Sequence, residues 1–144
     1  MTQPTSRDYI KDIADKLVRH HEGVRTHPYQ DTVGKITIGV GRNLTDRGLS
    51  VDEINQMFQN DMIIAADILD IWCPSWRGFT ANRQAALLSM AFNLGGPRLS
   101  DFVKLHQALV AGDFEEAATQ ALDSRWAKQV GRRADEIARL LRSG

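Results

Sequence analysis

Two carboxylates flank a short polar segment near the start of this 144-residue chain. Glu22 follows a stretch of helical periodicity, and Asp31 opens a turn that contains Gly34. Two carboxyl groups in different environments suit the cleavage of a glycosidic bond, because one must keep its proton and act as an acid while the other must be ionised. The pair therefore indicates glycoside hydrolysis.

Each carboxylate also has an ordinary interpretation, and taken singly that interpretation is favoured. Glu22 can be a solvated residue at a helix end, and Asp31 can be a residue that only initiates a turn. The catalytic interpretation rests on unlike surroundings. The negative end of a helix dipole disfavours an ionised Glu22, whereas backbone N–H groups of a turn favour an ionised Asp31.

Hydrophobic periodicity, capping residues and turn residues predict the elements that position this segment. Ser50 and Glu53 form a capping box at the start of a long helix. Gly95-Gly96-Pro97 ends a helix that is apolar on nearly all sides. We expect helices over residues 6–22, 50–71, 81–94, 100–111, 114–122 and 131–141, a short helical or turn segment over 124–129, and a strand over 35–40.

This order of elements predicts an α+β, mostly helical fold in a single domain over residues 1–144. We expect two lobes within it. A small β-hairpin lobe spans about residues 20–52, and a helical lobe takes residues 1–19 plus 72–144. A connecting helix over about 50–71 joins the two lobes.

The amino-acid composition limits the classes to which this protein can belong. Lys plus Arg and Asp plus Glu each number 18, so the net charge is zero and gives no signal for nucleic acid. The single cysteine, Cys73, excludes an intrachain disulfide and is expected in the core. The four histidines lack a metal-ligand spacing, so no metal is expected. No signal peptide and no membrane-spanning stretch is recognised, which predicts a location in the cytoplasm without stable membrane association.

The segment around the two carboxylates resembles the phage-lysozyme family, the T4-like endolysins of glycoside hydrolase family 24. The family pattern is Glu, eight residues, Asp, five residues and Thr, followed by I-G-x-G. Glu22, Asp31 and Thr37 fit these spacings without a gap, and the run from Ile38 to Gly41 follows. The likeness extends from about Tyr9 to Arg139 and implies a two-lobed lysozyme-like fold.

The resemblance implies a role for each matching residue. Glu22 would protonate the leaving glycosidic oxygen, Asp31 would position a water or stabilise the positively charged sugar, and Thr37 would hold that water. Arg133 would pair with the catalytic glutamate, and Asn93 would hydrogen-bond to substrate or to Glu22. Thr37 can equally be an ordinary strand residue, Arg133 a solvated arginine, and Asn93 a polar helix-end residue.

Two positions depart from the best-known relatives. His21 stands before Glu22 where an aspartate is expected. Arg42 stands where a histidine pairs with an aspartate at the position of Asp61. We expect an Arg42–Asp61 ion pair, which would remove one link that titrates near physiological pH.

Together these features predict a muramidase that hydrolyses the β-1,4 bond between N-acetylmuramic acid and N-acetylglucosamine in peptidoglycan. The resemblance implies inversion at the anomeric carbon, no cofactor, a monomer, and a phage setting. In that setting the protein accumulates in the host cytoplasm and a holin releases it to the cell wall.

Two alternatives remain open at this point. The first is a catalytically inactive module that binds peptidoglycan, although the retained set of Glu22, Asp31 and Thr37 argues against it. The second is a muramidase delivered differently, either in a phage tail or as a secreted antibacterial protein.

Overall fold

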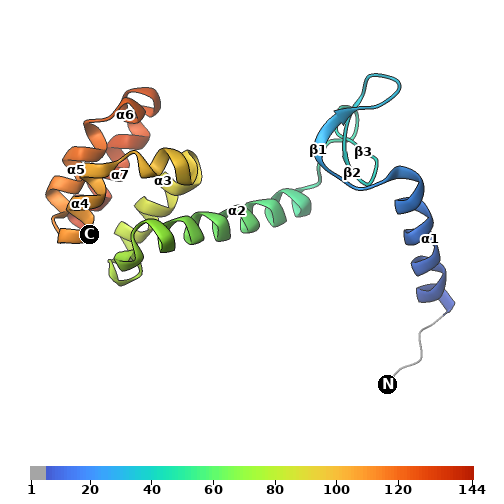
Figure 1. Cartoon of the computed structure of the whole chain (residues 1–144), viewed down its shortest axis with the longest axis horizontal. Coiled ribbons are helices and arrows are strands. Elements are labelled where there is room, and N and C mark those ends of the chain that lie inside the picture. Colours follow the sequence, from blue (N-terminus) through green and yellow to red (C-terminus); the bar gives the residue numbers. More distant parts are fainter. Residues whose placement is uncertain (1–5) are drawn as a thin grey trace. The chain divides into compact units, whose positions relative to one another are not determined.

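The computed structural model describes residues 6–144, which divide into two compact units, one that ends at Ile54 and one that runs from Asn55 to Gly144 (Figure 1). The helices are α1 (Ser6–Glu22), α2 (Val51–Trp72), α3 (Ala81–Ser100), α4 (Val103–Ala111), α5 (Phe114–Leu122), α6 (Arg125–Val130) and α7 (Arg132–Ser143), with a 3-10 helix η1 (Pro74–Gly78). The strands are β1 (Arg25–Gln30), β2 (Ile36–Gly39) and β3 (Arg42–Asn43). The predicted α+β, mostly helical fold is confirmed.

The first unit contains α1 and the sheet. Helix α1 ends at Glu22 because Gly23 adopts a left-handed conformation, with φ of 72°, and its N–H donates to the carbonyl of Arg19 at 2.9 Å. The helix end predicted at this glycine is confirmed, and Glu22 is the last residue of α1.

The sheet has three antiparallel strands in the order β1-β2-β3. Thr37 lies in the central strand, opposite Tyr29 on one side and Asn43 on the other. The register of β1 against β2 is irregular between Arg25 and Tyr29. The predicted strand and the predicted turn at Asp31 are both present, and they place Asp31 and Thr37 in one hairpin.

A capping box starts α2, as predicted. The backbone N–H of Glu53 donates to the hydroxyl of Ser50 at 3.2 Å, and the N–H of Ser50 donates to the carboxylate of Glu53 at 2.9 Å. These two bonds satisfy backbone donors that the first helical turn leaves without partners.

The second unit holds the hydrophobic core. Its helices bury aliphatic side chains and alanines together with two tryptophans. The largest fully buried side chains are Leu69, Cys73, Leu87, Met90, Leu99, Leu105, Leu109 and Leu141. Cys73 is therefore a core residue, as predicted. The aromatics after α2 also pack between elements, since Trp76 is buried and the Phe79 ring meets the Phe114 ring edge-on at 5.0 Å.

One helix boundary was predicted wrongly. Ser100 was expected to open a helix, but it is the last residue of α3, and α4 begins at Val103. The Ser100 hydroxyl donates back to the carbonyl of Gly96 at 2.9 Å, so it joins the preceding helical turn in place of capping the next one. The break predicted at Gly95 is present, because Gly95 has non-helical angles inside α3.

Other caps follow the sequence. Thr80 accepts a hydrogen bond from the N–H of Arg83, and Asp113 accepts one from the N–H of Glu116. Within residues 6–144, no helix is both long enough and apolar enough to cross a membrane.

Candidate active site

Glu22 ends α1 with an exposed side chain whose carboxyl group lies against the backbone of Gly41. A Cβ atom added to Gly41 would lie 2.8 Å from Oε2 of Glu22. The turn between β2 and β3 therefore approaches the end of α1 as closely as a glycine allows. The chain folds here so that the first predicted catalytic group meets the sheet.

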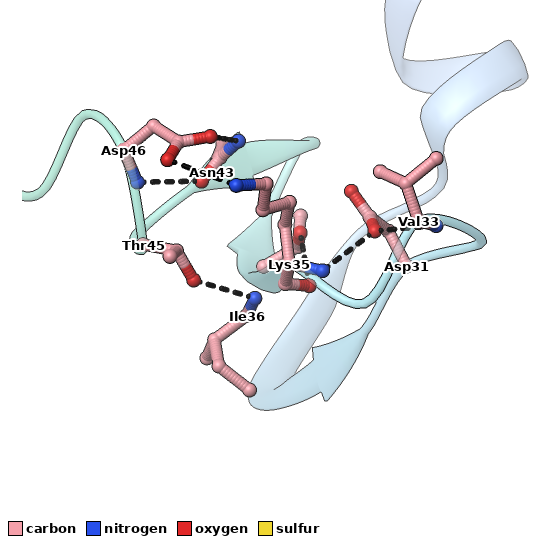
Figure 2. A network of polar contacts seen from close by, with 8 residues as sticks. Asp31, Val33, Lys35, Ile36, Asn43, Thr45 and Asp46 are labelled. Carbon is pink, nitrogen blue, oxygen red and sulfur yellow. Dashed lines mark hydrogen bonds and ion pairs between the residues drawn. The ribbon is translucent and has the colours of Figure 1, made fainter.

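Asp31 is held by the backbone of its own turn (Figure 2). Its Oδ1 accepts hydrogen bonds from the N–H of Val33 at 3.0 Å and from the N–H of Lys35 at 2.8 Å. The main chain closes the same turn, because the N–H of Asp31 donates to the carbonyl of Lys35 at 2.9 Å. Both of these hydrogen bonds go to the same oxygen, which fixes the orientation of the carboxylate.

Thr37 is the one buried residue of the described part of the first unit, with 4% of its surface exposed. Its hydroxyl donates to the carbonyl of Lys35 at 3.2 Å. The peptide groups of Lys35 thus bind both Asp31 and Thr37. The structure brings these two predicted residues together through the main chain.

Polar side chains bind the segment that follows β3 to this hairpin (Figure 2). The ammonium group of Lys35 pairs with Asp46 at 3.1 Å. Asp46 also accepts from the side-chain amide of Asn43 at 3.0 Å, and the hydroxyl of Thr45 accepts from the N–H of Ile36 at 2.9 Å. These contacts hold the segment after β3 against the strand that carries Thr37.

Arg42 has a different partner from the one predicted. Its guanidinium donates to both carboxylate oxygens of Glu53, at 2.5 and 2.6 Å, and more weakly to the carbonyl of Gly48 at 3.3 Å. The expected contact with Asp61, which lies in the second unit, stays a prediction. Glu53 is available because the capping box turns its side chain back toward the start of α2, within reach of β3.

The Arg42–Glu53 pair changes the titration of both groups. The hydrogen bonds from Arg42, with a smaller contribution from the N–H of Ser50, lower the pKa of Glu53 to about 2. The same hydrogen bonds raise the pKa of Arg42. The pair is therefore charged at any pH near neutrality and ties the sheet to the first turn of α2.

The remaining predicted residues lie in the second unit. Asn93, on α3, accepts a hydrogen bond from the indole N–H of Trp126 at 2.7 Å. Arg133, on α7, donates to the carbonyl and the hydroxyl of Ser89, both at 3.2 Å. The contacts of Asn93 and Arg133 with Glu22 or with substrate stay predictions.

The described part of the second unit is hollowed in places. Asp61 lines a hollow of about 290 Å³ together with side chains of α2 and α3. A larger hollow, of about 650 Å³, lies among residues 94–105 and 120–129 and is lined by Phe102 and Trp126 beside charged groups that include Lys104 and Arg125. Neither hollow was predicted from the sequence.

No cluster of three or more His, Cys, Asp and Glu side chains within residues 6–144 could hold a metal ion. The site is therefore described by its carboxylates, hydroxyl and backbone groups.

Three functional contacts were missed in the sequence. Lys35 was not singled out, although an aspartate at the first position of a turn commonly accepts from N–H groups that follow it. Glu53 was recognised as a cap but not as an ion-pair partner. Gly41 was noted only as part of a motif, and its contact with Glu22 depends on how α1 meets the sheet.

Comparison with known proteins adds an independent line of evidence. The sequence model of a family described as Phage lysozyme matches residues 19–142. The chain is 29% identical to the pre-baseplate central spike protein Gp5 of Enterobacteria phage T4, over 90% of this chain but 27% of that protein. It is 22% identical to a probable T4-type lysozyme 2 of Dictyostelium discoideum, over 89% of this chain and 92% of that protein. The chain thus spans about a quarter of the first relative and nearly all of the second.

Proposed function

Because the chain belongs to the phage lysozyme family, whose members are glycoside hydrolases, we propose that it is a muramidase. Membership in this family implies peptidoglycan hydrolysis, and the resemblance noted in the sequence is confirmed. The proposed reaction is hydrolysis of the β-1,4 bond between N-acetylmuramic acid and N-acetylglucosamine. The observation that carries the proposal is the single unit that holds Glu22, Asp31 and Thr37 around one hairpin.

Glu22 is the proposed general acid. It gives its proton to the glycosidic oxygen as the bond to the anomeric carbon breaks, which lets the alcohol leave uncharged. Its exposed position at the end of α1 leaves the carboxyl group accessible to a glycan strand. The contact with Gly41 restricts where that carboxyl group lies.

Asp31 and Thr37 are proposed to place the water that attacks the anomeric carbon. Oδ1 of Asp31 is occupied by two backbone donors, so Oδ2 faces the reaction and stabilises positive charge on the sugar or orients the water. The hydroxyl of Thr37 gives its hydrogen to the Lys35 carbonyl, which leaves its oxygen to accept from the water. This water attacks from the face opposite the leaving group and inverts the anomeric carbon, while the Asp31 carboxylate takes up the proton that the water loses.

Reducing-end release from purified peptidoglycan tests the enzyme directly. We compare the wild type with Glu22→Gln and, as a matched control on the same helix, with Asp12→Asn. The proposal expects release by the wild type and the control, and none by a folded Glu22→Gln. NMR of the first products is expected to show the α-anomer. If the wild type binds peptidoglycan but releases nothing, the inactive binding module is the correct interpretation.

The phage setting is the finer part of the proposal. We propose that the enzyme lyses a host cell from inside after a holin opens the membrane, and that it acts as a monomer. Expression in bacteria tests this: lysis is expected only after the inner membrane is permeabilised. Lysis without permeabilisation would contradict dependence on a holin.

One observation favours a second setting. The chain matches a 27% portion of a pre-baseplate central spike protein, so a similar sequence occurs within a longer phage protein. Mass spectrometry of purified virions distinguishes the two settings. Peptides of this chain in intact particles would support tail delivery, and their absence from particles, with abundance in the infected cell, would support lysis from inside.

A further inference from the structure

Gly41 makes a close approach to another residue, which its place in the I-G-x-G motif does not explain. Of the glycines with positive φ in the first unit, Gly41 has a functional side chain within 4 Å of the position its Cβ would occupy. The nearest atoms all belong to Glu22, with Oε2 at 2.8 Å, Cδ at 3.1 Å and Cγ at 3.3 Å. A real Cβ cannot lie 2.8 Å from an oxygen, so the missing side chain leaves the space in which the Glu22 carboxyl group lies.

We propose that Gly41 is a positioning residue that sets where the Glu22 carboxyl group lies by leaving this space empty. The helix fixes the backbone of Glu22, since Gly23 ends α1 directly after it. The carboxyl group lies at the end of a flexible side chain, and the backbone of Gly41 limits the space on one side of it. The proposal rests on the proposed function, in which Glu22 is the acid.

The chemistry explains why this limit on the space matters. A general acid must lie within hydrogen-bond reach of the glycosidic oxygen, and a displacement of about 1 Å can lower the rate by about 10²-fold. A methyl group at position 41 can be accommodated most easily by moving the carboxyl group of Glu22, because this group is the movable end of a side chain. The substitution should therefore affect the reaction more than it affects folding.

The chain offers a matched control two residues away. Gly39 has φ of +67° and Gly41 has φ of +66°, so alanine meets a positive φ at both positions. A Cβ on Gly39 has no atom within 4 Å, whereas a Cβ on Gly41 meets Glu22. The two alanine variants therefore compare a substitution that meets Glu22 with one that does not.

The experiment measures kcat and KM on soluble peptidoglycan fragments for the wild type, Gly39→Ala and Gly41→Ala, across a range of pH. We expect kcat of Gly41→Ala to be at least about tenfold below that of Gly39→Ala, with similar KM. We also expect the alkaline limb of its pH profile to move, because activity is lost on that side when the general acid gives up its proton, and a purely structural role would not cause this change. Equal kcat values and equal pH profiles for the two variants would overturn the proposal.

A second readout separates this proposal from the proposed function. The ¹³C signal of the Glu22 carboxyl carbon, assigned by its loss in Glu22→Gln, should shift in Gly41→Ala and stay in place in Gly39→Ala. An inactive wild type would refute the proposed function, and the carboxyl signal would still decide the positioning role. If the signal does not move in Gly41→Ala, the proposal is wrong.

A failure of Gly41→Ala to fold is also informative. The double variant Glu22→Ala/Gly41→Ala removes the atoms that a Cβ would meet. The proposal expects this double variant to be more stable than Gly41→Ala alone. A double variant that is no more stable would show that the positive φ of Gly41, and not its contact with Glu22, requires a glycine, and would overturn the proposal.

Discussion

The two carboxylate oxygens of Asp31 have different roles. One oxygen makes the structural hydrogen bonds, and the other is proposed to take part in the reaction. Oδ1 accepts from the N–H groups of Val33 and Lys35 and so closes the turn. An amide oxygen can accept the same two hydrogen bonds. Substitution by asparagine therefore removes the charge while it keeps the turn.

We expect Asp31→Asn to fold normally and to lose activity by on the order of 10²–10⁴-fold, because the amide cannot orient the water or stabilise positive charge on the sugar as a carboxylate does. Reducing-end release measures the activity, and thermal unfolding checks the fold. Unchanged turnover in the folded variant would exclude Asp31 from the reaction.

The Arg42–Glu53 pair gives a prediction about pH. The pKa of Glu53 is lowered to about 2 from its ordinary 4.5, mainly by the hydrogen bonds from Arg42. A lowered pKa in the folded protein means that the pair stabilises the fold fully above pH 4.5. This contribution is lost as the pH falls toward 2, where Glu53 becomes protonated.

We expect Arg42→Met to raise the pKa of Glu53 toward 4.5 without reaching it, because the N–H of Ser50 still donates to the carboxylate. A ¹³C NMR titration of the glutamate side chains measures this shift. If the pKa of Glu53 stays near 2 in Arg42→Met, then Arg42 is not what lowers it.

Residue-level predictions from the sequence succeeded where the partners are near in the chain, but they missed the pairing of Arg42 with Glu53. The turn of Asp31 and the cap at Ser50 depend on atoms within four residues, so their residue types were sufficient. Arg42 was assigned to Asp61 by resemblance to a histidine–aspartate pair. A guanidinium has a longer reach and a forked shape, and it finds Glu53, whose orientation depends on the cap.

Among the elements, helices with local start signals were predicted well. Thr80 and Asp113 each accept from an N–H three residues later, which a sequence pattern can reveal. Ser100 has the same residue type but bonds backward, and only the packing around α3 decides between the two outcomes. Strand β3 is two residues long and has no periodicity, so only its pairing with Thr37 and Ile38 defines it.

The cap of α5 yields a prediction at this scale. Asp113→Ala removes the acceptor for the N–H of Glu116 and should lower the free energy of unfolding by about 0.5–2 kcal/mol. Asp113→Asn keeps an acceptor and is the control, with a smaller expected loss. Urea unfolding measures both, and an Asp113→Ala protein as stable as the wild type would contradict the capping role.

At the scale of the whole molecule, burial is unevenly shared between the two units. Thr37 is the single buried residue among residues 6–54, whereas the second unit contains the entire cluster of buried apolar side chains. Since buried apolar area is the main source of stability, the second unit is expected to be the more resistant to opening. We therefore expect the unit with the proposed chemistry to open more readily.

Hydrogen exchange of backbone amides tests this distribution. We expect the slowest exchange in α3, α5 and α7, with free energies near that of global unfolding, and faster exchange in β1 and β2. Native-state hydrogen exchange followed by NMR gives the free energy of opening for each amide. Sheet amides as slow as those of α5 would contradict the expected difference.

The role of Lys35 has a consequence for how this site tolerates sequence variation. Its N–H binds Asp31 and its carbonyl binds Thr37, so the main chain at this position matters more than the side chain. The ammonium group contributes an exposed ion pair with Asp46, which is worth about 0–1 kcal/mol. A saturation library at position 35 should therefore accept most residues and reject proline, the one amino acid without the N–H. Position 35 is thus a place to alter surface charge beside the proposed catalytic groups without replacing any of them.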